Sequence, residues 1–249
     1  MATLPNPLPR LAELGLHLPP GALVDGLLWL ADGQAAPGEW TALRRKAPRV
    51  GLLPVVVEAG SRPGGPGLWE LEPARMSYPG DHDAEEVLEE FWDAHTDEEW
   101  PGLAEAPQGA GAEPEAVAAD VVESLLDGAA AGGPLKDPRL ALVPARRSAD
   151  IPAAIGWMGP ANHENDTARL SAVLRSWEDR FGIRVVAFGF DTLLVSVAAP
   201  PTTLAEAQAL AAEHYAFCPD TVGQGADPTL AAYAERRLLG RTAWHFWWD

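Results

Sequence analysis

Three side chains close together in the sequence could do chemistry as a group: His214, Cys218 and Asp220. His214 and Cys218 are four residues apart, so they share one helix face if the helix extends that far. Imidazole, thiolate and carboxylate are all ligands that a soft divalent metal such as zinc accepts. The same trio also allows a reactive thiolate, because a neighbouring imidazole lowers the pKa of a cysteine. An alternative stays open, since a buried cysteine often packs as a small apolar side chain.

A second candidate is the aromatic segment 244–249, which reads Trp-His-Phe-Trp-Trp-Asp. Strand alternation would place Trp244, Phe246 and Trp248 on one face and His245, Trp247 and Asp249 on the other. We expect the first set to fill the core. The second set, with Trp247 and Asp249, is then either a binding surface or a contact with the N-terminal region.

A third candidate is the acidic stretch 81–100, which contains no Lys or Arg. Asp83 followed three residues later by Glu86 resembles a helix-capping box, and the apolar residues that follow repeat at helical spacing. The segment is therefore predicted to be a helix with one apolar stripe. Its carboxylates could dock a basic partner or could simply be solvated. The candidate binding residues are Glu85, Glu86, Glu89, Glu90 and Asp93.

The cluster 163–166, His-Glu-Asn-Asp, directly precedes a predicted helix. Asn165 or Asp166 is a natural N-cap, which explains the cluster without a ligand. Metal binding is the weaker alternative, because no matching set of ligands follows.

The elements from residue 140 onward are predicted from periodicity and capping signals. We expect a strand at 153–157, a helix ending at Gly182, a hairpin of 183–188 with 192–197, a helix opened by Thr203 and Glu206, a helix opened by Asp227, and a last strand at 244–248. This order predicts an α+β domain with a ferredoxin-like split β-α-β-β-α-β sandwich and an extra helix.

The N-terminal part is predicted to be a smaller α/β region, with residues 1–20 extended and a strand at 52–57. Residues 68–71 are its expected hairpin partner, and Pro54 favours an edge position. The predicted domains are 1–100, an Ala/Gly/Pro-rich linker over 101–139 with a short helix at 115–126, and 140–249.

Several segments of the C-terminal part resemble a bacterial family, common in actinobacteria, that is known as domain of unknown function 4253. The resemblance covers about residues 140–249 and lies in the segments 174–182, 191–193, 200–201, 213–220, 224–225 and 247–249. The family has no established activity, so the resemblance implies no mechanism.

Composition narrows the function classes. A net charge of −18 argues against generic nucleic-acid binding, which needs cations to neutralise phosphates. The single cysteine excludes an intrachain disulfide and favours a reducing cytoplasm; we find no secretion signal and no run long enough to span a bilayer. The common phosphate-loop, nucleophile-elbow and zinc-protease motifs are missing, and no cofactor is expected.

We therefore expect a non-catalytic protein-binding module for a basic partner, an inhibitor or immunity-type factor being one form of it. The alternative is a metal-binding or thiol-dependent enzyme centred on His214, Cys218 and Asp220.

Overall fold

A mixed seven-stranded sheet organises the chain. The computed structural model describes residues 6–61, 63–107, 111–130, 133 and 135–249. The strand order is β1-β2-β4-β3-β5-β6-β7, in which β3 and β5 are parallel and the other neighbours are antiparallel. The strands are β1 (Gly21–Val24), β2 (Leu28–Ala31), β3 (Leu52–Glu58), β4 (Pro138–Pro144), β5 (Arg184–Phe188), β6 (Thr192–Ser196) and β7 (Ala243–Trp247).

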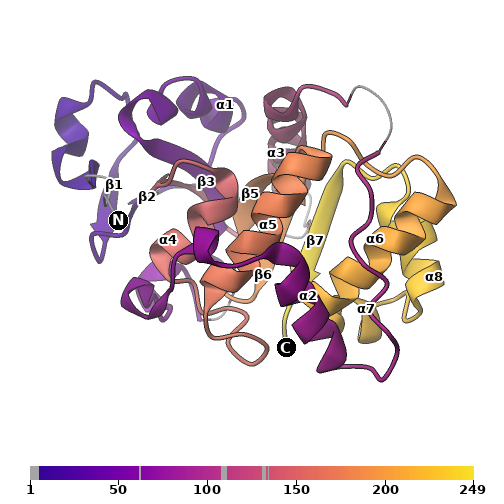
Figure 1. Cartoon of the computed structure of the whole chain (residues 1–249). Helices are drawn as coiled ribbons and strands as arrows, with labels where there is room; N and C mark the ends of the chain where they lie inside the picture. The colour runs from indigo at the N-terminus through magenta and orange to yellow at the C-terminus, as the bar shows by residue number, and fades with distance from the viewer. Residues whose placement is uncertain (1–5, 62, 108–110, 131–132, 134) are drawn as a thin grey trace.

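Helices cover both faces of this sheet (Figure 1). On one face lie α1 (Glu39–Arg44) and α3 (Pro114–Ala130), which pack on the smaller apolar cluster. On the other face lie α2 (Ala84–Asp93), α4 (Ile151–Ile155), α5 (Thr167–Phe181) and α6 (Leu204–Phe217), which build the larger cluster. Helix α2 packs across α5 and α6.

The remaining elements are short. Three turns between α6 and β7 are α7 (Pro219–Gly223), α8 (Leu230–Tyr233) and a π-helical turn (Ala234–Leu238). The 3-10 turns are Leu8–Glu13, Ala47–Val50, Pro66–Leu68, Pro73–Arg75, Pro79–Asp81 and Ser148–Asp150. Within the described residues, no helix has the length and apolar character that crossing a membrane requires.

Local signals in the sequence correctly predicted several elements. Asp83 caps α2 by accepting hydrogen bonds from the amides of Glu85 and Glu86, and Thr203 and Glu206 form the full capping box of α6. Gly182 ends α5 with φ of 62°, in the left-handed region that favours glycine. The hairpin of β5 with β6 and the final aromatic strand are also confirmed.

Other predictions were wrong. Residues 153–157 belong largely to α4, because Pro152 suits a first helical turn and Gly156 ends the helix in a left-handed conformation. Residues 66–68 form a 3-10 turn instead of a hairpin strand, and Leu71 makes an isolated bridge with Trp157. Residues 8–13 are a 3-10 turn where an extended chain was expected; residues 1–5 lie outside the described part.

Pro54 lies in the central strand β3, between β4 and β5. A proline lacks the amide needed for a ladder, which favoured an edge strand. The β3–β5 pairing joins Val56 with Ala187 and Val57 with Phe188. The ladder between these strands therefore lies beyond Pro54 and does not need an amide at that position. The carbonyl of Pro54 instead accepts a hydrogen bond of 3.1 Å from the Trp40 indole.

The mixed α and β content is confirmed, and the ferredoxin-like arrangement is not. Strand β3, from the N-terminal part, lies between β4 and β5, so it separates β4 from the neighbouring strands β5, β6 and β7. The predicted linker contains a helix, α3, that is longer than expected. Linker residues 108–110, 131–132 and 134 lie outside the described part of the chain.

A buried carboxylate joins three parts of the larger core. Glu213 of α6 is fully buried and pairs with Arg180 of α5 through contacts of 2.8 and 2.6 Å. It also accepts hydrogen bonds from the Trp177 indole (2.8 Å) and from the Ala104 amide (2.7 Å). Arg180 donates to the Ala104 carbonyl (2.7 Å), which ties the segment after α2 to both helices.

We predict that Glu213→Ala lowers the free energy of unfolding by about 3–5 kcal/mol, because it leaves the half-buried cation of Arg180 and two buried donors without a partner. Urea unfolding followed by circular dichroism measures this. The matched control is Glu99→Ala at an exposed site, expected to change stability by less than about 0.5 kcal/mol. Equal effects of the two substitutions would contradict the role of Glu213.

Candidate functional site

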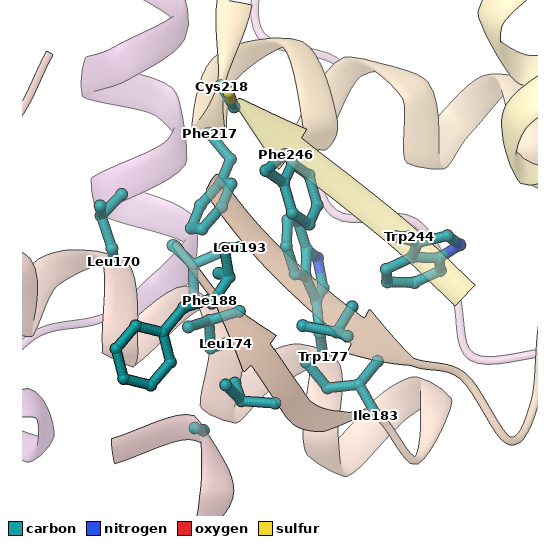
Figure 2. Packing of buried hydrophobic residues seen from close by; sticks show 14 of the residues in the cluster. Leu170, Leu174, Trp177, Ile183, Phe188, Leu193, Phe217, Cys218, Trp244 and Phe246 are labelled. Atoms are coloured by element: carbon teal, nitrogen blue, oxygen red, sulfur yellow. The ribbon is translucent and has the colours of Figure 1, made fainter. Parts of the chain in front are cut away.

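His214 and Cys218 lie in the core, in contact with the aromatic cluster, as Figure 2 shows for Cys218 beside Phe217. His214 Nδ1 lies 3.0 Å from the Tyr233 hydroxyl. Burial lowers the pKa of His214 well below its ordinary value, and the Arg180 cation lowers it further. The Cys218 thiol donates to the Trp247 carbonyl at 3.0 Å and lies 3.0 Å from the Thr221 hydroxyl.

This arrangement favours neither form of the enzyme hypothesis. Burial raises the pKa of the Cys218 thiol to about 12, so it is protonated at neutral pH. Asp220 is occupied elsewhere, accepting from the Gln224 amide (2.8 Å) and from the Asp249 backbone (3.1 Å). In the part of the chain that the structure describes, no three His, Cys, Asp or Glu side chains form a group that could hold a metal ion.

The cluster 163–166 acts as the predicted cap and as a contact with α2. Asp166 caps α5 by accepting from the Ala168 amide. The ring of His163 packs against Phe91 of α2, with 4.7 Å between centroids, and stacks on His95 at 5.4 Å. Burial, together with the nearby His95, lowers the pKa of His163 to about 4. The loop before α5 is thereby held against the acidic segment.

The acidic helix α2 has the predicted division of faces. Its apolar stripe is buried against α5 and α6. All five candidate carboxylates are exposed: Glu85, Glu86, Glu89, Glu90 and Asp93. Glu90 pairs with Arg169 of α5, which leaves the other four without a recorded ion pair among the described residues.

The last strand separates its faces as alternation predicts. Trp244, Phe246 and Trp248 are buried, and in Figure 2 Trp177 of α5 and Phe217 of α6 meet Phe246. Trp247 is half-buried and Asp249 is exposed. Trp247 borders a pocket beside the turns before β7, and Asp249 borders one beside the β5–β6 turn.

An aromatic pocket of about 570 Å³ lies where the β5–β6 turn meets the end of β7. The pocket is built from four segments that are far apart in the sequence. The lining residues that matter for its chemistry are Trp69, Glu70, Trp157, Phe190, Asp191, Trp248 and Asp249. We call this site the aromatic pocket.

Hydrogen bonds and ring contacts fix the walls of the aromatic pocket. The Trp157 indole donates to the carbonyls of Gly189 (3.1 Å) and Phe190 (3.0 Å), which holds the β5–β6 turn. Trp157 and Trp248 meet edge to face at 5.6 Å, and Trp69 meets Phe190 at 6.5 Å. Because these residues are anchored on the core side, the pocket is preformed.

The four aromatic side chains around the aromatic pocket differ in exposure. Phe190 is 41% exposed, whereas Trp69, Trp157 and Trp248 are buried. The ring of Phe190 is therefore the aromatic surface that a ligand reaches most directly. The indole N–H of Trp248 is buried and has no hydrogen-bond partner among the described residues.

Asp191 supplies negative charge in the same place. Burial raises the pKa of Asp191 above its ordinary value, and the nearby Glu58 carboxylate raises it further, while hydrogen bonds from its own backbone and from Trp247 lower it. A carboxylate in this setting is stabilised by an incoming cation.

Comparison with known protein families bears on the C-terminal part. Residues 139–249 match the family model described as Domain of unknown function (DUF4253). The match supports the resemblance seen in the sequence. No curated protein and no solved structure matched the chain.

Four of the six segments that carry the DUF4253 resemblance fall into two groups in the structure. Segments 174–182 and 213–220 supply Trp177, Arg180 and Glu213, which form the buried hydrogen-bond network around the Glu213 carboxylate. Segments 191–193 and 247–249 supply Asp191, Trp248 and Asp249 of the aromatic pocket. The matched segment thus contributes most of the pocket wall, and Trp69 and Glu70 come from outside it.

Sequence reasoning missed Trp69, Trp157, Phe190 and Asp191 as site residues. Phe190 and Asp191 carried one usable signal, since an aromatic residue in a predicted hairpin turn has no core to enter. Trp69 and Trp157 carried no such signal, because they come together through the isolated β-bridge between Leu71 and Trp157, two residues far apart in the sequence.

We predict that Cys218 is inert in the folded protein. With a pKa of about 12, the thiolate fraction at pH 8 is on the order of 1 in 10⁴, against a large fraction for an unfolded cysteine. Reaction with a disulfide reagent at pH 8 should therefore be slow in buffer and fast, with one thiol per chain, in denaturant. Fast stoichiometric reaction of the native protein would revive the thiol-enzyme hypothesis.

Proposed function

We propose that this chain is a non-catalytic module that binds a positively charged protein partner, with the aromatic pocket receiving a cationic side chain. The observation that carries the proposal is the combination of four aromatic rings with the carboxylates of Glu70, Asp191 and Asp249 around one pocket.

Aromatic faces attract cations, and this attraction is stronger in partly desolvated sites. Lys and Arg suit such a pocket, because their aliphatic stems pack on apolar walls while their charged ends reach carboxylates. A cation close to Asp191 would also favour its ionised form, which burial disfavours.

The acidic helix supports the same partner chemistry from beside the pocket. Ala161 and Asn162 line the aromatic pocket, and the next residue, His163, packs against Phe91 of α2. The exposed carboxylates of α2 therefore lie next to the loop that forms one pocket wall. Their field would draw a basic partner toward this side of the molecule.

We predict that short cationic peptides bind the aromatic pocket. The probes are acetyl-Gly-Arg-Gly-amide and acetyl-Gly-Lys-Gly-amide, followed by tryptophan fluorescence, with acetyl-Gly-Glu-Gly-amide as the charge control. Phe190→Ala should weaken cationic binding by about 2- to 30-fold through loss of the cation–π contact, and Asp191→Asn should weaken it through loss of charge.

The matched control variant is Leu204→Ala, at an exposed apolar residue that begins α6 and does not line the pocket. It should bind like the parent protein. If Phe190→Ala and Leu204→Ala bind alike, or if the acidic peptide binds as well as the cationic ones, the proposal fails.

A second prediction concerns the acidic helix. Neutralising it with Glu85→Gln, Glu89→Gln and Asp93→Asn should slow association with a basic peptide several-fold at low salt and leave dissociation nearly unchanged, because distant charges act on encounter. Stopped-flow fluorescence at low and high salt measures both rates. The difference between variant and parent should vanish at high salt, where the charges are screened.

The control carries the same charge change on other surfaces, through Asp32→Asn, Asp120→Asn and Asp127→Asn. Asp120 and Asp127 are exposed on α3, which covers the opposite face of the sheet. If this variant slows association as much as the α2 variant does, net charge and not the α2 surface controls the encounter.

A further inference from the structure

A second pocket, of about 490 Å³, lies between β7 and the turns that precede it. Figure 1 shows β7 and α8 at the end of the molecule away from β1. Arg236, Arg237 and Arg241 line this pocket together with Thr221, Trp244 and His245. We call it the arginine pocket. The carboxylates of Asp220 and Asp227 also line it, so the three arginines exceed the acidic residues by one, in a chain whose net charge is −18.

Two of the arginines already hold an oxyanion. Arg236 Nη1 donates to one oxygen of Asp227 and Arg237 Nε donates to the other, each at 2.8 Å. The sequence predicted Asp227 as a helix cap, but Thr229 caps α8 and Asp227 faces these arginines instead. The contact shows that both guanidinium groups present N–H donors to a planar anion, while their side chains remain 66% and 54% exposed.

The backbone places these arginines through a π-helical turn. The Leu239 amide donates to the Ala234 carbonyl, five residues earlier, at 3.0 Å. Such wide turns occur frequently at functional sites. Here the turn lets two consecutive arginines reach the same carboxylate from one wall of the pocket.

Further donors in the arginine pocket lack an anion. Arg241 uses its Nε on the Arg236 carbonyl at 3.0 Å and forms no recorded ion pair within the described residues. The Trp244 side chain is 3% exposed, and its indole N–H has no hydrogen-bond partner in the described part of the chain. An oxyanion in this space would pair with the guanidinium of Arg241.

We propose that the arginine pocket binds a phosphate group of a small molecule. A phosphate has enough oxygens to meet several guanidinium groups, whose rigid N–H forks match it. Asp227 occupies part of the donor set and competes with the ligand, so it lowers the affinity for phosphate. This site is separate from the aromatic pocket and does not depend on the function proposed above.

The test is isothermal titration of the full chain at low ionic strength with inorganic phosphate and, separately, with phenyl phosphate. We expect saturable binding that Arg241→Gln weakens by about tenfold or more, since a charge-assisted hydrogen bond is lost. Asp227→Asn should strengthen binding, because it removes the competing charge. The matched control, Arg49→Gln, changes an exposed arginine outside the pocket and should bind like the parent.

The two probes distinguish the source of the phosphate. Tighter binding of phenyl phosphate indicates a phosphate ester whose organic part contacts the pocket wall, and equal binding indicates free phosphate. Circular dichroism and thermal unfolding confirm that each variant is folded. No saturable binding of either probe to the parent, or equal binding by Arg241→Gln and Arg49→Gln, would overturn the proposal.

Discussion

The buried carboxylate of Glu213 connects α6 to α5 and to the segment after α2. A charge without water must be matched by donors, and four of them converge on it: two from Arg180, the Trp177 indole and the Ala104 amide. These partners come from α5 and from the segment after α2. The chain therefore cannot place α6 correctly unless α5 and that segment are in position at the same time.

The hydrogen-bond network around Glu213 also determines where the aromatic residues lie. Trp177 donates to Glu213 and stacks on Phe246 of β7 with 5.5 Å between ring centroids. The last strand is therefore packed directly against α5. Phe246 in turn contacts Phe217 and Trp248. The end of β7 is held between two differently charged spaces: the aromatic pocket, with its carboxylates, and the arginine pocket, with its guanidinium groups.

Sequence patterns predicted the features that depend on near neighbours in the chain. The caps at Asp83 and Thr203, the end of α5 at Gly182 and the alternation along β7 each involve residues a few positions apart. The misread segment at 153–157 is short and apolar, a pattern that does not separate a buried strand from a buried helix. Pro152 and Gly156 were the signals that favoured the helix.

The site itself could not be predicted, because it depends on pairing between distant strands. Nothing local shows that β3 enters the sheet between β4 and β5, and this insertion aligns the β5–β6 turn with residues of the N-terminal part. Trp69 and Phe190 meet across that junction. The same limit applies to His214 and Cys218: their spacing is helical as expected, but burial turns a pair of possible ligands into core residues.

The most direct test of cation binding in the aromatic pocket is a nitrogen–proton spectrum of the tryptophan indoles during titration with the arginine tripeptide. Trp69, Trp157 and Trp248 border the aromatic pocket, whereas Trp29 and Trp40 are buried in the smaller cluster on the other face of the sheet. The account predicts saturable shifts for the first three signals and unchanged positions for Trp29 and Trp40. Shifts at Trp29 and Trp40, or no shift at the three pocket residues, would contradict it.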